Sequence, residues 1–264
     1  MQPRPDFGES SYRGHERLLD RAALITGGDS GIGRAVALSF AREGANVSIA
    51  YLNEHTDAEE TMRLVTTTGR TCVTTAGDIA DNAHAKRVID DTVARFGRID
   101  ILVNNAAVQD KAVEKFEDLT VDRIERTFQV NIIAMFNLVR HALPHMRPGA
   151  TIINVASIQA YRPNPSIIDY ATTKGAVVTF TKCLAQELIK RGIRVNAVAP
   201  GPVWTPLIPQ SFDSEKVKHF GENSPMERPA QPVELAPAFV FLASEESRYV
   251  NGEILGVTGG ELLA

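Results

Sequence analysis

Short apolar runs recur along the chain from Ala22 onward, and the longer segments between them carry apolar residues at helical spacing. Most of these runs are apolar throughout, which is typical of strands that are covered on both faces of a parallel sheet. The pattern predicts seven strands, at Ala22–Thr26, Val47–Ala50, Cys72–Ala76, Ile101–Asn104, Thr151–Ala156, Ile193–Ala199 and Ile254–Val257. It predicts intervening helices at Gly31–Glu43, Thr56–Thr67, Ala83–Phe96, Val121–Leu143, Tyr170–Arg191 and Pro232–Ala243.

The alternation of strand and helix predicts the fold class. Repeated strand–helix–strand units indicate an α/β fold with a doubly wound parallel seven-stranded sheet and helices on both faces, a single-domain Rossmann fold. A polar arm, residues 1–20, precedes this domain, residues 21–264. We expect the arm to lie on the surface or to be partly disordered.

The stretch from Pro200 to Pro232 departs from this rhythm. It holds seven prolines and one plausible short helix, near Ser214–Phe220. An insertion of this length near the end of an α/β sheet is more often a functional lid than a loose loop. We therefore expect residues 202–225 to form a lid over the substrate.

The composition is that of an ordinary globular protein. The chain has 264 residues, of which 44% are hydrophobic and 23% charged, and its net charge is −4. No basic surplus is available to neutralise phosphates, so nucleic acid is not an expected partner. No apolar run approaches the ~20 residues of a membrane helix. The arm lacks the apolar centre of a signal peptide, so we expect no membrane partner and a cytoplasmic location, with Cys72 and Cys183 as reduced thiols.

A glycine-rich turn, TGGDSGIG at residues 26–33, joins the first predicted strand to the first helix. Gly27 would let the chain turn sharply, Gly31 would leave room for a pyrophosphate, and Gly33 would let the helix pack close to the sheet. The helix N-terminus adds free N–H groups and a positive dipole end. A tight strand–helix connection is the alternative, but the position in a series of βαβ units favours nucleotide binding.

The end of the second predicted strand should lie near the adenosine ribose, where a carboxylate would favour NAD. The chain reads YLN at residues 51–53, with neither an acid nor a base, while Glu54 comes late and His55 is neutral at pH 7. Ser30 gives no cationic phosphate contact either. These residues leave the choice of NADP or NAD undecided.

Polar residues also follow the third and fourth predicted strands. Asp78 could hydrogen-bond the adenine edge, or it could serve as an acid of a turn or a helix N-terminus. Asn104 and Asn105 could satisfy loose backbone groups beside the cofactor, although such a pair is also common in turns.

Tyr170 and Lys174 lie four residues apart near the start of a predicted helix, which places both side chains on one face. A free tyrosine has a pKa of ~10, and a neighbouring ammonium and a cationic nicotinamide would lower it toward the working range. Ser157 follows the fifth strand at the ligand-binding edge of the sheet and could hydrogen-bond a substrate oxygen. Asn131 could hold a water that leads to Lys174, or it could be a buried amide satisfied by the backbone.

These features together resemble the short-chain dehydrogenase/reductase superfamily, in its Tyr-x-x-x-Lys branch. The resemblance runs from Arg21 to the C-terminus and rests on TGGDSGIG at 26–33, Asp78, NNAA at 104–107, Asn131, Ser157, YATTK at 170–174 and RVNAVAPGPVWT at 194–205. Ala107 stands where the family usually has glycine. The N-terminal PDFGESSYRGHERLLDR and the C-terminal part look like a bacterial subgroup described as NADP-dependent aldehyde reductases or general-stress oxidoreductases, which includes plant glucose and ribitol dehydrogenase homologues.

The resemblance implies an NAD(P)-dependent oxidoreductase that moves a hydride between nicotinamide and a carbonyl or alcohol carbon of an aldehyde, ketone or sugar-type substrate. Tyr170 would be the general acid/base, Lys174 would lower its pKa and hold the nicotinamide ribose, Ser157 would orient the carbonyl, and Asn131 would complete a proton relay. For the choice of cofactor, the resemblance to this subgroup is the only feature that slightly favours NADP. The expected cofactor-binding residues are Gly27, Ser30, Gly31, Ile32, Gly33, Tyr51, Asp78, Asn104, Asn105, Ala106, Tyr170, Lys174, Pro200, Gly201, Val203 and Thr205.

Three residues beside these positions are candidates for the substrate wall: Gln159, Tyr161 and Trp204. Plain loop packing would explain the two aromatic residues equally well. His141 and His145 have a spacing that can bind metal on a helix, but Pro144 indicates that the helix is ending, so no metal site is expected.

Two other functions remain as alternatives. A non-catalytic dinucleotide-binding sensor on the same fold would not need Asn131, Ser157, Tyr170 and Lys174 together, and all four are present. A sugar epimerase or dehydratase would be expected to carry a long C-terminal substrate domain.

The predicted helices Val121–Leu143 and Tyr170–Arg191 carry apolar residues on more than one face. One face must pack on the sheet, and a partner subunit would cover the second. The family resemblance implies a homotetramer in which each active site is built from one subunit.

Overall fold

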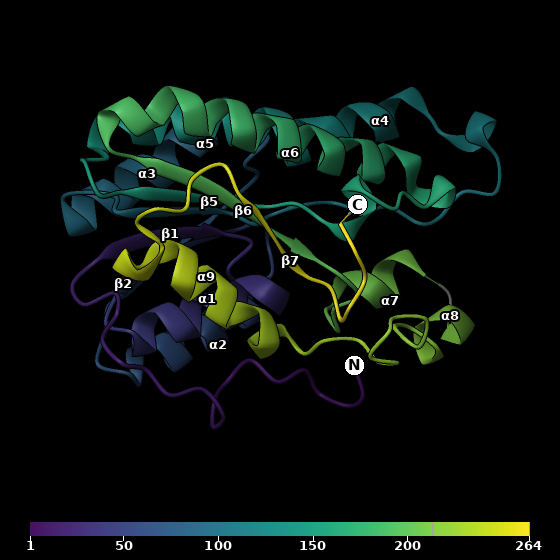
Figure 1. The fold of residues 1–264 in the computed structure, drawn as a ribbon, viewed down its shortest axis with the longest axis horizontal. Coiled ribbons are helices and arrows are strands. Elements are labelled where there is room, and N and C mark those ends of the chain that lie inside the picture. The colour runs from purple at the N-terminus through teal and green to yellow at the C-terminus, as the bar shows by residue number, and fades with distance from the viewer. Residues whose placement is uncertain (213, 264) are drawn as a thin grey trace.

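Seven parallel strands form one sheet in the order β3-β2-β1-β4-β5-β6-β7 (Figure 1). The computed structural model describes residues 1–212 and 214–263. The predicted fold class is confirmed, and the ends of the strands differ from the predicted ones by at most one residue. The strands are β1 Ala22–Thr26, β2 Asn46–Tyr51, β3 Cys72–Ala76, β4 Ile101–Asn104, β5 Thr151–Val155, β6 Arg194–Pro200 and β7 Ile254–Val257.

Helices cover both faces of this sheet (Figure 1). On one face lie α1 Gly31–Arg42, α2 His55–Thr66 and α9 Pro232–Ala243. On the other lie α3 Asn82–Phe96, α4 Val121–Phe128, α5 Ala134–Ala142 and α6 Ile168–Leu188. The helix predicted over residues 121–143 is present, but Gln129–Ile133 form a π-helical turn between α4 and α5.

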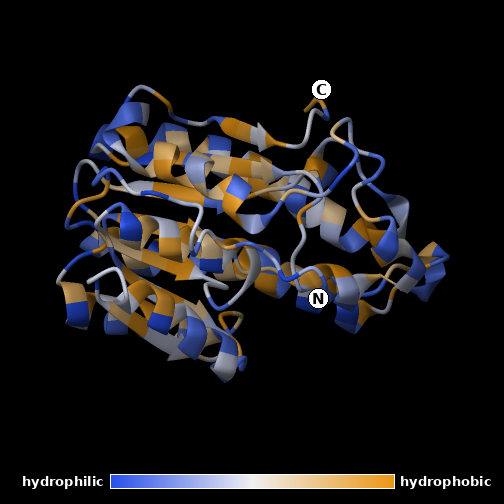
Figure 2. Ribbon diagram, turned by 90° about the horizontal axis from the view of Figure 1, so that it is seen from below, coloured by the Kyte–Doolittle hydropathy of each residue, from blue (hydrophilic) through white to orange (hydrophobic). Residues whose placement is uncertain are grey.

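The strands are buried on both faces, which explains why their sequences are apolar throughout instead of alternating. Ile25 and Ile49 pack in a core with residues of α1 and α9. Leu24 and Leu102, which point the other way, pack in a second core with residues of α3 and α5. Figure 2 shows the same layering, with hydrophobic strands at the centre and hydrophilic residues on the outer sides of the helices.

The segment predicted to form a lid lies beyond the carboxyl ends of the strands, in its described residues 202–212 and 214–225 (Figure 1). It contains two short helices, α7 Leu207–Ser211 and α8 Ser214–Lys218, of which only the second corresponds to the short helix predicted near Ser214–Phe220. The first was missed because Pro209 suggests a break, although proline is tolerated in the first turn of a helix.

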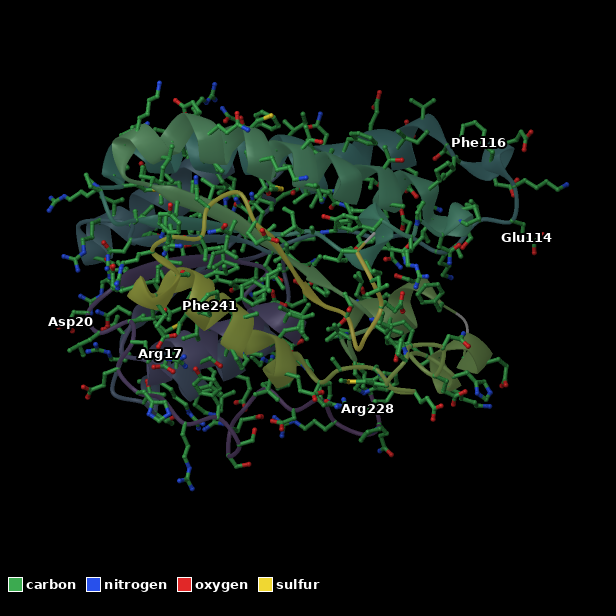
Figure 3. All side chains as sticks on the ribbon, in the orientation of Figure 1. Arg17, Asp20, Glu114, Phe116, Arg228 and Phe241 are labelled. Atoms are coloured by element: carbon green, nitrogen blue, oxygen red, sulfur yellow. The ribbon has the colours of Figure 1, made fainter. Side chains whose placement is uncertain are left out.

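The N-terminal arm lies against α1 and α9. Phe7 and Leu18 are buried. At the start of α9, the Asp6 carbonyl oxygen accepts a hydrogen bond from the Val233 N–H, and the Asp6 N–H donates one to the Gln231 side-chain oxygen. Arg17 and Asp20 lie on the arm side of the molecule, far from the loop that carries Glu114 and Phe116 (Figure 3). The arm therefore packs against the domain at these residues, while residues 1–4 and 13–16 are exposed.

Candidate active site

A cavity of about 670 Å³ opens at the carboxyl ends of the strands, beneath the lid. Its wall combines the β1–α1 turn, the residues that follow β2 to β6, the start of α6 and the lid. Parallel strands bring all these loops to the same edge of the sheet, which is where α/β proteins bind their ligands. Residues that are far apart in the sequence therefore meet in one site.

The glycine-rich turn has the backbone that the sequence predicts. Gly27 and Gly31 have φ angles of 62° and 52°, in the left-handed region that favours glycine. A side chain on Gly33 would lie 1.9 Å from the Gly27 carbonyl oxygen, so Gly33 allows α1 to pack against the turn, and it does not line the cavity. The N-cap residue of α1, Ser30, leaves the first N–H groups of the helix without a side-chain cap. This end of α1 fits a pyrophosphate.

The two asparagines that follow β4 have different positions. Asn105 lines the cavity, and its side-chain amide donates to the carbonyl oxygens of Thr26 and Gly27, at 2.9 and 3.0 Å. Asn104 instead donates to the Asn154 side chain at 2.9 Å, between β4 and β5, and does not line the cavity. Asn105 thus fixes the glycine-rich turn, while Asn104 joins two strands.

Asp78 lies at the cavity and also serves as an acid of the turn after β3. It lines the cavity after β3, and its carboxylate accepts hydrogen bonds from the Ala80 N–H at 2.9 Å and from Arg126 at 2.6 Å. Burial acts to raise the pKa of Asp78, but the guanidinium of Arg126 and the Ala80 N–H together hold it below its ordinary value. Asp78 is therefore a charged acceptor at the wall of the cavity.

Ser157, Tyr170 and Lys174 meet at the inner wall of the cavity, as predicted from their spacing and strand position. All three side chains are largely buried. The Lys174 ammonium donates to the Val155 carbonyl oxygen at 2.7 Å and lies 5.3 Å from the centre of the Tyr170 ring. A phenol, a hydroxyl and an ammonium thus share one water-poor corner.

Burial dominates the electrostatics of this corner. It raises the pKa of Tyr170 to about 12, and the neighbouring Ser157 hydroxyl opposes that rise. It lowers the pKa of Lys174 to about 8. The shift of the phenol runs opposite to the lowering expected from Lys174, whose ammonium is directed at the Val155 carbonyl.

Asn131 lies in the π-helical turn and is buried. Its side chain accepts from the Val108 N–H at 2.8 Å and donates to the Val108 carbonyl oxygen at 3.0 Å and to Thr173 at 3.1 Å. It does not line the cavity. This arrangement corresponds to the alternative of a buried amide satisfied by the backbone, and it ties the loop after β4 to the residue next to Lys174.

An ion pair that the sequence analysis missed holds the start of α6. Asp169, the neighbour of Tyr170, accepts two hydrogen bonds from Arg123, at 2.8 and 2.9 Å, and one from Thr127 at 3.1 Å. Arg123 also donates to the Lys111 carbonyl oxygen at 2.7 Å. The pair anchors α6 to α4 across 46 residues of sequence, so no local sequence pattern indicates it.

The substrate side of the cavity agrees only partly with prediction. Gln159 lines the cavity, but Tyr161 and Trp204 do not. The Trp204 indole N–H donates to the Pro3 carbonyl oxygen at 2.9 Å, and Tyr161 packs beside a small core cluster. Both aromatic residues therefore contribute to loop packing, the alternative considered for them. Residues that line the cavity without having been predicted include Gln109, Arg162, Ile167, Leu207, Phe212, Phe220 and Glu261.

Most of the predicted cofactor residues line this cavity. The exceptions are Gly33 and Asn104. The residues that line it as predicted are Gly27, Ser30, Gly31, Ile32, Tyr51, Asp78, Asn105, Ala106, Tyr170, Lys174, Pro200, Gly201, Val203 and Thr205.

Within residues 1–212 and 214–263, no group of three or more His, Cys, Asp or Glu side chains has an arrangement that could hold a metal ion, and His141 instead bonds Asn82 at 2.9 Å. No helix over the same residues has the length and apolar character needed to span a membrane.

Known proteins resemble this chain over most of its length. A family model described as enoyl-(acyl carrier protein) reductase matches residues 27–261. The uncharacterized oxidoreductase YhxC of Bacillus subtilis is 52% identical, with 100% of this chain and 91% of the relative covered. NADPH-dependent aldehyde reductase 1 of Arabidopsis thaliana, a chloroplastic protein, is 47% identical, with 100% and 93% covered.

A solved structure gives the same result for the fold. A short-chain dehydrogenase from Burkholderia cenocepacia J2315, in complex with NADP, matches with a TM-score of 0.86 and 32% sequence identity, covering 92% of this chain and 98% of that chain. The chain belongs to the short-chain dehydrogenase/reductase family and is an NAD(P)-dependent oxidoreductase that transfers hydride between nicotinamide and a carbonyl or alcohol carbon.

Proposed function

We propose that this enzyme interconverts a small aldehyde, ketone or sugar-type carbonyl compound and its alcohol, with Tyr170 as the residue that donates and accepts the proton. The observation that carries the proposal is the meeting of Tyr170, Ser157 and Lys174 in one buried corner of a cavity that also contains the open N-terminus of α1. A non-catalytic sensor would need only the second of these features.

The chemistry follows from the protonation states. Bound dinucleotide supplies or accepts the hydride at the nicotinamide. Tyr170 keeps its proton at neutral pH, because burial raises its pKa to about 12. As hydride reaches the carbonyl carbon, Tyr170 Oη gives its proton to the carbonyl oxygen and the alcohol forms, and oxidation reverses both transfers. Ser157 holds the carbonyl oxygen, and the Lys174 ammonium stabilises the phenolate that remains.

The dinucleotide would lie across the carboxyl edge of the sheet. Gly27, Ser30, Gly31 and Ile32 would surround its pyrophosphate, since they form the turn and the uncapped start of α1. Tyr51 and Asp78 would flank the adenosine. The nicotinamide half would then lie toward the catalytic corner, against Asn105, Ala106, Pro200, Gly201, Val203 and Thr205.

The substrate end combines apolar and polar side chains. Leu207, Phe212 and Phe220 come from the lid, and Gln109 and Gln159 face the same space. The side-chain nitrogen of Gln109 is buried and has no hydrogen-bond partner among the described residues, so it can donate to a second oxygen of the substrate. A small carbonyl compound with a further hydroxyl group fits this wall, in keeping with the aldehyde reductase named among the relatives.

The assembly and location complete the proposal. Ile133 and Phe136 are 42% and 53% exposed on the outer side of the α4–α5 segment, and Phe136 lies 4.5 Å from the Phe180 ring of α6. We propose that a second subunit covers this apolar face in a homotetramer. A cytoplasmic location stays a prediction.

Replacing Tyr170 by Phe tests the catalytic assignment. The change removes the transferable proton and keeps the ring, so turnover should fall ~10²- to 10⁴-fold while dinucleotide binding persists. The assay follows NAD(P)H absorbance over a panel of aldehydes, ketones and sugars with both cofactors. Tyr161→Phe is a matched control, because it removes a phenol hydroxyl outside the cavity. A Tyr170→Phe enzyme with nearly unchanged kcat on a substrate of the native enzyme would refute the proposal.

A further inference from the structure

Polar side chains of α4 and the π-helical turn bond the residues of α6 that precede Tyr170 and Lys174. The donors lie four residues apart and are Arg123, Thr127 and Asn131. Asp169 accepts hydrogen bonds from the first two, and Thr173 accepts one from the third. Consecutive residues point to different sides of a helix, so this bonded face lies beside the face that carries Tyr170 and Lys174 at the cavity. These contacts therefore set the rotation of α6 about its axis.

We infer that the ion pair between Arg123 and Asp169 positions Tyr170 for proton transfer, and that it also sets the substrate wall formed by the loop after β4. Neither Arg123 nor Asp169 lines the cavity, so both act through other residues. The inference rests on the proposed function, because it takes Tyr170 as the residue that transfers the proton. It adds two positioning residues to the reaction.

The ion pair is bidentate and buried. Arg123 Nε donates to one carboxylate oxygen of Asp169 at 2.8 Å, and Arg123 Nη2 donates to the other at 2.9 Å. Two parallel bonds fix the plane and the direction of the carboxylate, which a single bond does not. The side chain of Asp169 is 1% exposed and that of Arg123 is 13% exposed, so little water competes for these bonds.

Asp169 anchors the first turn of α6. The N-cap residue of this helix, Ile167, has no polar side-chain atom with which to cap it, and the Asp169 carboxylate lies in the turn that follows. Burial acts to raise the pKa of this carboxylate, but Arg123, the Tyr170 N–H and Thr127 together hold it below its ordinary value. The carboxylate is therefore charged at neutral pH, and it interacts with Tyr170 itself as well as with α4.

The same guanidinium also reaches the substrate wall. Arg123 Nη1 donates to the Lys111 carbonyl oxygen at 2.7 Å, in the loop after β4. Gln109 of this loop lines the cavity. A backbone hydrogen bond from the Val113 N–H to the Ser166 carbonyl oxygen, at 2.8 Å, joins the loop to the segment before α6. Arg123 therefore connects the wall at Gln109 with the helix that carries the proton donor.

Replacing Asp169 by Asn tests the pair with an isosteric change. The amide weakens the bidentate contact, and kcat should fall about 10-fold or more, because a small misplacement of a reacting group is costly. Titration calorimetry with NADH and NADPH should show full binding stoichiometry and affinities within about twofold of the native values, because the loss lies in the reaction step. A kcat within about twofold of the native value in this folded variant would overturn the inference.

Two changes at Arg123 separate its contacts. Arg123→Gln removes the bidentate pair and the bond to the Lys111 carbonyl oxygen, so kcat should fall and the KM for the substrate should rise. Arg123→Lys keeps the charge without the bidentate geometry, so its kcat should be about threefold or more above that of Arg123→Gln and still below the native value. Native kcat in both Arg123 variants would overturn the inference even if Asp169→Asn fails to fold.

A double variant and a control distinguish positioning from a general loss of stability. Arg123→Gln combined with Asp169→Asn should lower kcat no more than Arg123→Gln alone, because both changes remove the same contact, and additive losses would contradict it. Asp100→Asn is the matched control. Asp100 accepts from Arg98 at 2.8 Å, its side chain is 12% exposed, and it lies just before β4, outside the cavity. It should lower Tm and leave kcat unchanged, and a loss of kcat equal to that of Asp169→Asn would refute a specific role of the pair.

The outcomes separate this inference from the proposed function. Native kcat in Tyr170→Phe refutes the proposed function and the inference with it. Lost turnover in Tyr170→Phe, with native kcat in both Asp169→Asn and Arg123→Gln, refutes the positioning role alone.

Discussion

Lys174 is a cation whose side chain is almost fully buried. Its ammonium is held by the Val155 carbonyl oxygen at 2.7 Å, and burial lowers its pKa from 10.5 to about 8. Tyr170 is shifted in the other direction, to about 12. Between these two values the pair would hold a neutral amine beside a neutral phenol, and the positive charge that stabilises the phenolate would be lost.

This difference predicts the pH dependence of carbonyl reduction. Below pH 8 both groups carry their protons, so kcat should be level, and it should fall as the pH rises through about 8 because Lys174 loses its charge. The measurement is kcat against pH at saturating cofactor. In Lys174→Met the rate should be low and this limb should be absent. A level native profile up to pH 10 would contradict the assignment of Lys174.

The spacing of residues in the sequence predicted that Tyr170 and Lys174 lie together. It did not predict contacts between residues that are distant in the sequence, and these contacts place Asp169 and Trp204. Tyr170 and Lys174 are one helical turn apart, so the sequence places them together. The partners of Asp169 and Trp204 lie 46 and 201 residues away, at Arg123 and Pro3. No periodicity reports such pairs, which explains why the ion pair was missed and why Trp204 was a candidate for the substrate wall.

The N-terminal arm has no regular secondary structure, and one buried carboxylate binds several of its residues. Glu43, just after α1, has a fully buried side chain. It accepts hydrogen bonds from the Tyr12 hydroxyl at 2.5 Å and Arg17 at 2.6 Å, and from the N–H groups of His15 and Arg17 at 2.8 and 3.1 Å. Burial acts to raise the pKa of Glu43, but these donors lower it to about 2.

The arm should therefore depend on Glu43. Glu43→Gln should lower the free energy of unfolding by about 2–3 kcal/mol, because it weakens charge-assisted hydrogen bonds in a buried site. For a chain of this size that corresponds to a fall in Tm of about 5–10 °C. Glu16→Gln, an exposed acid of the arm, should change Tm little. Equal Tm values for native enzyme and Glu43→Gln would disprove this role.

The same element has a defined response to acid. The pKa of Glu43 is lowered by folding, so its contribution is present above the ordinary value of 4.5 and is lost as the pH falls toward 2. Folded Glu43 should keep its charge over the range in which exposed carboxylates titrate, while the stability that it contributes declines across that range.

At the scale of the whole molecule, the exposed apolar face of α5 and α6 is the subunit interface that we propose. Phe136→Glu should place a charge in the proposed interface and lower the mass measured by light scattering at micromolar concentration. Phe116→Glu is the matched control, because Phe116 is 68% exposed on the distant loop before α4 (Figure 3). A native enzyme that is monomeric and fully active at this concentration would refute the tetramer.

The sheet was predictable as a whole because its strands are buried on both faces. That burial makes each strand a continuous apolar run, and the pattern fixed all seven within one residue. The π-helical turn at Gln129–Ile133 was not predictable, since it keeps the apolar pattern of a helix and changes only the hydrogen bonds. The lid was partly predictable from its prolines, but α7 was not.

Trp204 gives the enzyme an optical reporter that needs no label. It is the only tryptophan in the sequence, it lies in the lid, and its indole N–H is bonded to the arm at Pro3. Indole emission depends on the polarity and hydrogen bonding around the ring. Intrinsic fluorescence excited at the indole will therefore follow the contact between the lid and the first residues of the chain, in real time and in unmodified protein.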